Sequence, residues 1–169
     1  MILGALSLRP MSGYEIKQLV DKATRFFWAA SYGQIYPELR RLEERGLVEG
    51  AEEPQGGRRR IVYRLTPAGS QALVDWLREP PRTMELRDEG LLKLFFAAPL
   101  AKDEAVALIR SIRESWAEPL ARLREIERND QPTGFPGLVL DFGLGMKEWM
   151  VEWSEHAERR LLNEIGGKR

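Results

Sequence analysis

Residues 47–66 carry the one strand-like pattern in a sequence of 169 residues that is otherwise patterned for helices. Two short runs, LVEGA and IVYRLT, flank the polar, glycine-rich segment EEPQGGRRR, and the second run alternates its side chains with a period of two. This pattern predicts a β-hairpin with a turn at its centre. The consecutive arginines Arg58, Arg59 and Arg60 therefore lie near the predicted tip of the hairpin.

Three helical patterns precede the hairpin. The first covers residues 2–8 and is apolar, so we expect a short buried helix. The second begins at Ser12, and Glu15 three residues later completes a capping box. The third has a possible N-cap at Ser31 and a glycine stop signal at Gly46.

A fourth helical pattern opens at Thr66, with Pro67 at the first helical position. The order of three helices, strand, turn, strand and helix is that of a winged helix-turn-helix, in which a two-stranded wing covers one side of a three-helix core. We predict a mainly α fold with this DNA-binding domain in residues 1–78. A polar connector (79–87) and a helical dimerisation domain (88–169) follow.

The second half is patterned for helices throughout. A short apolar helix is expected to be buried nearly all round, and it contains Leu91, Leu92, Leu94, Phe95 and Phe96. A long helix is expected over about 102–127, with a kink or break at Pro119. The segment NDQPTGFPG is predicted as a loop. The last helix has an apolar stripe at three- to four-residue spacing, made of Phe142, Met146, Trp149, Met150, Trp153, Ala157 and Leu161.

The length of the predicted long helix favours a second chain. About 26 residues at a rise of 1.5 Å span roughly 39 Å, which is more than one face of a domain of this size. A homodimer would cover the apolar stripes of the long and last helices. A closed monomeric bundle is the alternative.

The predicted third helix has one apolar and one polar face. Ile35, Leu39 and Leu42 recur at helical spacing and face the core. The residues on or beside the opposite face are Gly33, Gln34, Tyr36, Pro37, Arg40, Arg41 and Glu44. Small residues with amide and guanidinium groups around them suit a helix end in a major groove. Alternatively, the tyrosine packs under the hairpin and the arginines pair with nearby glutamates. Because a proline inside a helix is costly, Pro37 predicts a distorted first turn or a regular helix that starts later than Ser31.

The overall composition does not indicate which kind of partner the protein binds. The chain has 26 basic and 26 acidic residues, but residues 1–78 hold 12 basic against 9 acidic ones and the rest hold 14 against 17. It has no cysteine and a single histidine, His156, which argues against catalytic thiolates, disulfides and zinc sites. No catalytic residue, cofactor site or metal site is predicted. We find no signal peptide or transmembrane pattern, and expect a cytoplasmic protein without membrane contact.

Several segments together resemble the PadR family of bacterial transcriptional regulators. They are SGYEI (12–16), WAASYGQIYPELRRLEERGLV (28–48), GRRRIVYRLTPAG (57–69) and RDEGLLKLFFA (87–97). The helical second half resembles the larger members, which share a C-terminal domain type with the virulence activator AphA. The resemblance implies a homodimer held by C-terminal helices that binds a near-palindromic operator. Many members are repressors released by a small, often aromatic ligand.

The resemblance also implies positions that contact DNA. Ser12 and Tyr14 match the start of the second helix, and basic residues in the wing match phosphate contacts. Together with the outward face of the third helix, the candidate DNA-binding residues are Ser12, Tyr14, Ser31, Tyr32, Gln34, Tyr36, Arg40, Arg41, Arg58, Arg59 and Arg60.

An effector site is predicted from the aromatic and methionine stripes of the second half. Such residues can line a hydrophobic pocket, although a stripe of this kind is more often part of an ordinary core. The candidate ligand-binding residues are Trp116, Phe142, Met146, Trp149 and Trp153. A winged-helix protein-interaction module without DNA binding is the alternative function, and the near-neutral pI of about 6.7 favours it slightly.

Overall fold

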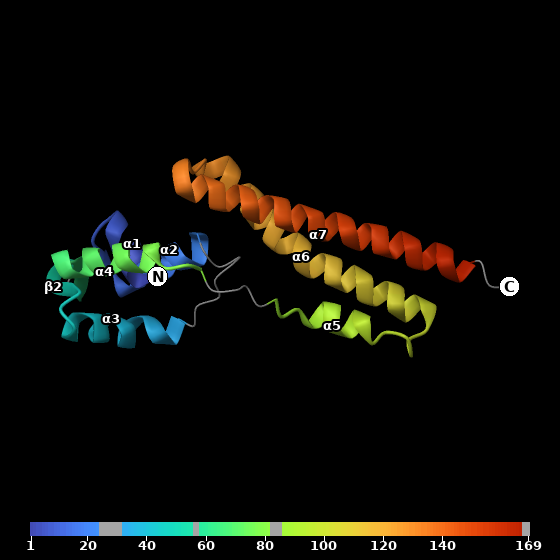
Figure 1. The fold of residues 1–169 in the computed structure, drawn as a ribbon, viewed down its shortest axis with the longest axis horizontal. Helices are drawn as coiled ribbons and strands as arrows, with labels where there is room; N and C mark the ends of the chain where they lie inside the picture. The colour runs from blue at the N-terminus through green and yellow to red at the C-terminus, as the bar shows by residue number, and fades with distance from the viewer. Residues whose placement is uncertain (24–31, 56–57, 82–85, 167–169) are drawn as a thin grey trace. The chain divides into compact units, whose positions relative to one another are not determined.

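The computed structural model describes residues 1–23, 32–55, 58–81 and 86–166 (Figure 1). Within these ranges the side chains of a few residues beside the gaps are not described. The elements, in chain order, are α1 (Ile2–Leu8), β1 (Met11–Ser12), α2 (Gly13–Ala23), the 3-10 turn η1 (Tyr32–Gln34), α3 (Ile35–Glu44), β2 (Val48–Gln55), β3 (Arg58–Leu65), α4 (Pro67–Arg78), α5 (Glu89–Phe95), α6 (Lys102–Asp130) and α7 (Gly134–Gly166).

The chain divides into two compact units, residues 1–83 and 84–169. The division falls within the segment 79–87 that the sequence marks as a connector. Helices α1 to α4 and the strands belong to the first unit, and α5 to α7 belong to the second. The first unit has the element order of a winged helix-turn-helix, and the second is helical throughout its described part.

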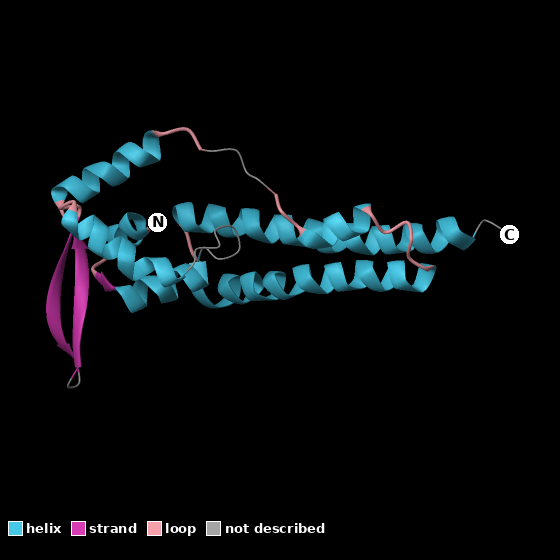
Figure 2. Cartoon of the chain, turned by 90° about the horizontal axis from the view of Figure 1, so that it is seen from below, coloured by secondary structure: helices cyan, strands magenta, loops and turns pink. Residues whose placement is uncertain are grey.

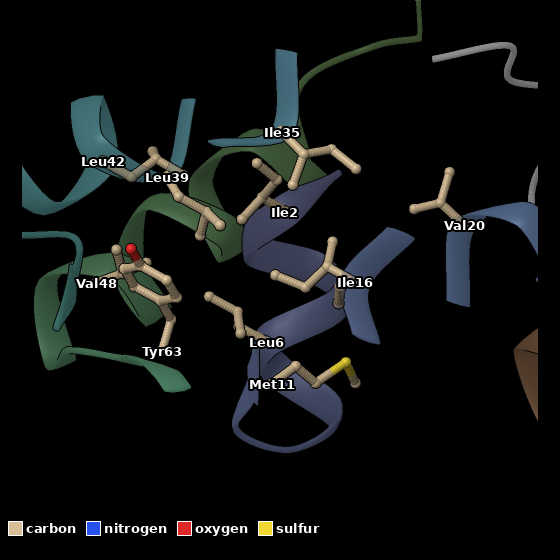
Figure 3. Packing of buried hydrophobic residues seen from close by; sticks show 11 residues of the cluster. Ile2, Leu6, Met11, Ile16, Val20, Ile35, Leu39, Leu42, Val48 and Tyr63 are labelled. Carbon is tan, nitrogen blue, oxygen red and sulfur yellow. The ribbon is translucent and has the colours of Figure 1, made fainter. Parts of the chain in front are cut away.

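The core of the first unit draws apolar side chains from every helix before the hairpin and from both long strands. Ile16 and Leu39 have no exposed surface, and Ile2, Leu6 and Tyr63 are buried beside them. Figure 3 shows these side chains pointing toward one another from α1, α2, α3 and β3. Full burial of one such aliphatic side chain contributes about 1.5–3 kcal/mol. The predicted short buried helix α1 is confirmed.

The sheet has three antiparallel strands in the order β1-β3-β2, so the expected two-stranded wing has a third, two-residue neighbour. In β1, Met11 pairs with Tyr63 and Ser12 pairs with Val62. Two residues are too few to show a strand period in the sequence, which is why β1 escapes prediction. Figure 2 shows β2 and β3 side by side, projecting away from the helices of their unit.

Local backbone conformation and capping hydrogen bonds fix the two helix ends that border the hairpin. Gly46 follows α3 with φ at 67°, a left-handed conformation that glycine adopts without a Cβ penalty. The side-chain oxygen of Thr66 accepts a hydrogen bond of 3.0 Å from the amide of Gly69, which caps α4 as predicted. The carbonyl of Leu47 then accepts the Thr66 amide at 3.2 Å and joins the start of β2 to the start of α4.

In the second unit α6 and α7 run side by side (Figure 1), and α5 packs against α6. A kink or a break is predicted at Pro119; helix α6 continues through this residue, so there is no break, and the kink stays a prediction. The predicted loop NDQPTGFPG is also too long, because α6 reaches Asp130 and α7 begins at Gly134. The predicted apolar stripe of this helix runs through Leu108, which is only half-buried. The buried face of α6 consists of Ala105, Val106, Ile109, Ile112, Trp116, Leu120 and Leu123.

The prediction for the apolar helix α5 is wrong within the single chain. Leu91 and Leu94 pack against the Ile112 and Trp116 cluster of α6. The other side is open: Leu92, Phe95 and Phe96 are 59%, 81% and 65% exposed. A seven-residue helix that rests on α6 by one face leaves the opposite face uncovered by any described element.

Candidate nucleic-acid interface

The 3-10 turn η1 leads directly into α3, and Pro37 is the third residue of α3. Amide groups in the first turn of a helix have no acceptor within the helix, so the missing proline N–H costs little there. The predicted late start of the regular helix is therefore confirmed. Gln34 is the N-cap residue, and its side chain makes no capping hydrogen bond. Ser31 lies outside the described residues.

Burial along α3 follows the predicted division into two faces. Ile35, Leu39 and Leu42 are 2%, 0% and 6% exposed and form part of the core (Figure 3). The opposite face is open to solvent and carries small, amide, aromatic and charged residues, namely Gly33, Gln34, Tyr36, Pro37, Arg40, Arg41 and Glu44. Helix α3 therefore presents a continuous polar surface that its own unit leaves uncovered.

Two glycines beside this surface have different surroundings. A Cβ at Gly33 would meet no atom within 4 Å, and the backbone there is not left-handed. A Cβ at Gly13 would lie 2.6 Å from Cε1 of Tyr36, because the tyrosine ring rests on the first residue of α2. Gly13 thus allows α2 and α3 to approach. Gly33 has no such role among the described residues.

The two arginines of the α3 surface differ in their partners. Arg41 pairs with Glu38 one turn away at 3.5 Å, and both side chains are well exposed. Arg40 is exposed and forms no ion pair with any residue in the described part of the chain. Burial and the Glu43 carboxylate raise the pKa of Tyr63 beneath it, whereas Arg40 acts in the opposite direction. Of the two arginines on this face, Arg40 is thus the one without an acidic partner among the described residues.

The start of α2 lies next to α3 and is organised by Glu15. Its Oε2 accepts hydrogen bonds of 2.8 Å from both the backbone amide and the hydroxyl of Ser12, and the Glu15 amide lies 3.4 Å from that hydroxyl. This arrangement is the predicted capping box. Tyr14 is 60% exposed, and Gln18 donates to its hydroxyl at 3.2 Å.

The hairpin is longer than the sequence pattern indicates. Arg58, Arg59 and Arg60 belong to β3 and lie opposite Gln55, Pro54 and Glu53 of β2, so they follow the turn instead of forming it. Backbone pairing continues through this polar stretch because the hydrogen bonds of a β-ladder join backbone groups and need no apolar side chains. The tip, residues 56 and 57, lies outside the described part. Of these three arginines, the side chain of Arg60 is described.

Arg60 is held by two carboxylates. Its Nη2 lies 3.3 Å from Oε2 of Glu53 on the neighbouring strand, and its Nη1 lies 3.5 Å from Oε2 of Glu15 on α2. Arg9 also reaches Glu15, with a distance of 3.0 Å between Nη1 and Oε1. Hydrogen bonds from Ser12, followed by a hydrogen bond from Arg9 and the positive charge of Arg60, lower the pKa of Glu15 to about 2. The sequence pattern predicts the capping role of Glu15 but gives no signal for its contacts with Arg9 and Arg60.

The five predicted ligand-binding residues do not form one lining within the chain. The rings of Trp116 and Trp153 lie 6.0 Å apart, with Met146 packed in the same cluster. Phe142 and Trp149, by contrast, are 61% and 63% exposed. Trp116, Met146 and Trp153 therefore pack with the core of the second unit.

The described residues of each unit line a hollow that the sequence did not indicate. In the first unit a space of about 1070 Å³ lies between α1, α3 and α4, with Leu42, Leu73 and Trp76 in its wall. In the second unit a space of about 530 Å³ lies between α5, α6 and α7, and Trp153 and His156 line it. Trp153 is thus the one predicted ligand residue that lines a hollow described here.

The described residues contain no cluster of three or more histidine, cysteine, aspartate or glutamate side chains that could hold a metal ion. Within the same residues, none of the helices combines the length and the apolar character needed to cross a membrane.

Comparison with known proteins matches both halves of the chain. Residues 2–75 match the Transcriptional regulator PadR-like family, and residues 86–161 match the family described as Virulence activator alpha C-term. The negative transcriptional regulator PadR of Bacillus subtilis is 31% identical, over 91% of this chain and 91% of its own length.

Solved structures agree with this relationship. The Bacillus subtilis PadR structure in complex with operator DNA has a TM-score of 0.84 and 31% identity, and the match covers 95% of this chain and 96% of that one. The structure of the same regulator with p-coumaric acid has a TM-score of 0.76 and 30% identity, with 95% of each chain covered. These matches span both units, and the resemblance drawn from the motifs is confirmed. The chain is a member of the PadR-like family of transcriptional regulators.

Proposed function

We propose that this regulator is a sequence-specific DNA-binding protein that inserts α3 into the major groove. The observation that carries the proposal is the exposed face of α3, where Gln34 and Arg40 stand beside small residues and opposite a fully buried stripe. Side-chain amides and guanidinium groups read base edges in this groove. The relative bound to operator DNA supports the same use of the fold.

The remaining candidates divide by the contacts they are suited to make. Tyr14 and Tyr36 are exposed at the adjoining ends of α2 and α3, where their hydroxyls suit phosphate contacts. Arg41 adds a cation on the same helix. Arg58 and Arg59 at the start of β3 extend the basic surface along the flanking backbone. Ser12 is bound to Glu15, so its part is to shape the start of α2.

We further propose that two copies bind together through the second unit. Phe95, Phe142 and Trp149 are 81%, 61% and 63% exposed, which is unusual for large aromatic residues of one small unit. A two-fold dimer would present two α3 helices to half-sites about 34 Å apart on a near-palindromic operator.

The proposed mode of control is repression relieved by a small aromatic ligand in the cytoplasm. A negative regulator among the relatives supports repression, and a p-coumaric acid complex supports a ligand of this class. Of the predicted ligand residues, Trp153 is placed to contact such a molecule because it lines the hollow between α5, α6 and α7.

The test is binding of the purified chain to the DNA upstream of its own gene, measured by gel shift and footprinting at two salt concentrations. We expect a protected near-palindromic site whose affinity falls steeply with salt. Equal, weak affinity for every duplex would contradict sequence-specific binding and favour the protein-interaction alternative. Addition of candidate aromatic ligands to the same footprint tests relief of repression.

Two substitutions separate sequence selection from phosphate affinity. Gln34→Ala should relax the preference at one or two base pairs, by about 1–3 kcal/mol per base contact. Replacement of Arg58 and Arg59 by alanine should weaken all duplexes alike and flatten the salt slope by about one per lost phosphate contact. If the slope of that double variant matched the wild type, the wing would not contact phosphates.

A further inference from the structure

Arg60 is held more firmly than Arg64, the other arginine of β3 whose side chain the structure describes. Its side chain is 36% exposed, whereas Arg64, on the same face of β3, is 57% exposed and pairs only with Glu49 among the described residues. The Nε atom of Arg60 is buried and has no hydrogen-bond partner among the described residues. The base of the guanidinium group is therefore shielded from solvent, and both of its outer nitrogens lie against carboxylates.

The two carboxylates belong to different elements. Glu53 lies directly opposite Arg60 in the β2–β3 ladder, and their ion pair reinforces the hairpin itself. Glu15 lies on α2, 45 positions earlier in the chain, so this ion pair joins the hairpin to the helix beside α3. The strand pairing of Ser12 with Val62 lies next to it and links the same two parts through the backbone.

Glu15 is well placed to orient Arg60. Its carboxylate is fixed by the amide and hydroxyl of Ser12 at 2.8 Å each, and it lies within the first turn of α2. A fixed carboxylate has little conformational freedom left to lose when it binds a guanidinium group. Arg60 would have to leave both acidic partners to reach a DNA phosphate, which lowers the net gain from such a contact.

We propose that Arg60 is a positioning residue that fastens the wing to the start of α2 through Glu15, and that it is not a phosphate contact. This assignment rests on the proposed DNA binding. It divides the arginine run: Arg58 and Arg59 supply phosphate affinity, and Arg60 sets where they lie relative to α3. Removal of all three arginines would then flatten the salt slope by the amount expected for two phosphate contacts, and not for three.

The deciding experiment compares Arg60→Ala with Glu15→Gln on the upstream duplex over a range of salt concentrations. Gln retains an oxygen that can accept the Ser12 amide, so Glu15→Gln removes the charge that holds Arg60 while the capping box remains. We expect both variants to lose about 3- to 10-fold in affinity with the wild-type salt slope. The double variant should bind no more weakly than Arg60→Ala alone. Arg64→Ala is the matched control, with the same charge change on the same strand face, and should bind like the wild type.

The opposite results would overturn the proposal. If Arg60 contacts a phosphate, Arg60→Ala flattens the salt slope by about 0.9. Glu15→Gln then frees the guanidinium group and leaves affinity unchanged or higher.

Hydrogen exchange in the absence of DNA tests the attachment of the wing by itself. Amides of β2 and β3 near Glu53 and Ile61 should exchange at least 3-fold faster in Arg60→Ala and in Glu15→Gln than in Arg64→Ala. Unchanged exchange would overturn the proposal. This measurement remains decisive if the wild type binds no DNA, which would refute the proposed function and not the attachment.

Discussion

The two units of this chain complete their cores to different degrees. In the first unit the buried side chains close around Ile16 and Leu39, and the exposed face of α3 is polar. In the second unit α6 and α7 bury one stripe between them, yet Phe95, Phe142 and Trp149 remain largely exposed. A polar open face suits a charged, hydrated partner such as DNA. An apolar open face requires a protein surface or a ligand to cover it.

Helix α4 is the exception to this comparison. It belongs to the first unit, but Trp76 and Leu77 are 57% and 64% exposed, and its one fully buried residue is Gly69. Helix α4 contacts α1 and β3, and it approaches the backbone of its unit most closely at Gly69 in its first turn. The contrast between the units therefore holds for the polar exposed face of α3 and the apolar exposed faces of the second unit.

The largest predicted effect concerns this attachment. A Cβ at Gly69 would lie 1.8 Å from the carbonyl oxygen of Leu47, a backbone atom that cannot rotate away. Gly69→Ala should destabilise the first unit by about 3 kcal/mol or more, measured by chemical denaturation. Gly4→Ala is the matched control, since a Cβ there meets nothing within 4 Å in helix α1. It should leave stability unchanged or raise it by about 0.5–1 kcal/mol. Similar losses in both variants would show that close packing at Gly69 is not the cause.

The next prediction concerns the apolar face of α7. Phe142 and Trp149 are seven residues apart and share one side of the helix. Glutamate at both positions would place two charges in the proposed dimer contact, and should weaken self-association at least about 100-fold, or about 2.7 kcal/mol. Analytical ultracentrifugation measures this change. Arg159→Glu, on an exposed part of the same helix, is the control for added negative charge and should remain dimeric. A double variant that dimerises like the wild type would remove this face from the interface.

Sequence patterns predicted the first unit more completely than the second for a physical reason. Short-range signals determine its elements: the capping box at Ser12, the left-handed Gly46 and the Thr66 cap each act over a few residues. They also defined the two faces of α3. Interactions between distant positions gave no such signal, so β1, the contacts of Arg60 and the length of the hairpin were missed. In the second unit apolarity predicted burial, but it does not tell which chain provides the cover, and the expectation for α5 was wrong within one chain.

A smaller effect is expected from Gly33, where the polar face of α3 begins. Because neither space nor backbone conformation requires glycine there, Gly33→Ala should change the free energy of unfolding by less than about 0.5 kcal/mol. Its added methyl group would stand where we propose that DNA approaches, and affinity for the upstream site should fall about 10-fold. Denaturation and gel shift on the same preparation measure both quantities. Unchanged affinity would show that DNA does not approach this end of α3.

The smallest predicted effect is the acid sensitivity of the first unit, which depends on Glu15. Its pKa is lowered to about 2 in the folded protein, chiefly by hydrogen bonds from Ser12. A group whose pKa is lower in the folded state stabilises the fold above its unfolded pKa, about 4.5, and that contribution is lost as the pH falls toward 2. Glu15→Gln should therefore cost about 1 kcal/mol at pH 7 and progressively less below pH 4.5. Denaturation at pH 7, 4 and 2.5 measures this loss of stability. The control is Glu44→Gln, which removes an exposed carboxylate from α3. Its stability should stay close to that of the wild type at all three pH values. A cost that stays constant with pH would mean that the glutamine disturbs packing, and that the charge of Glu15 is not what stabilises the start of α2.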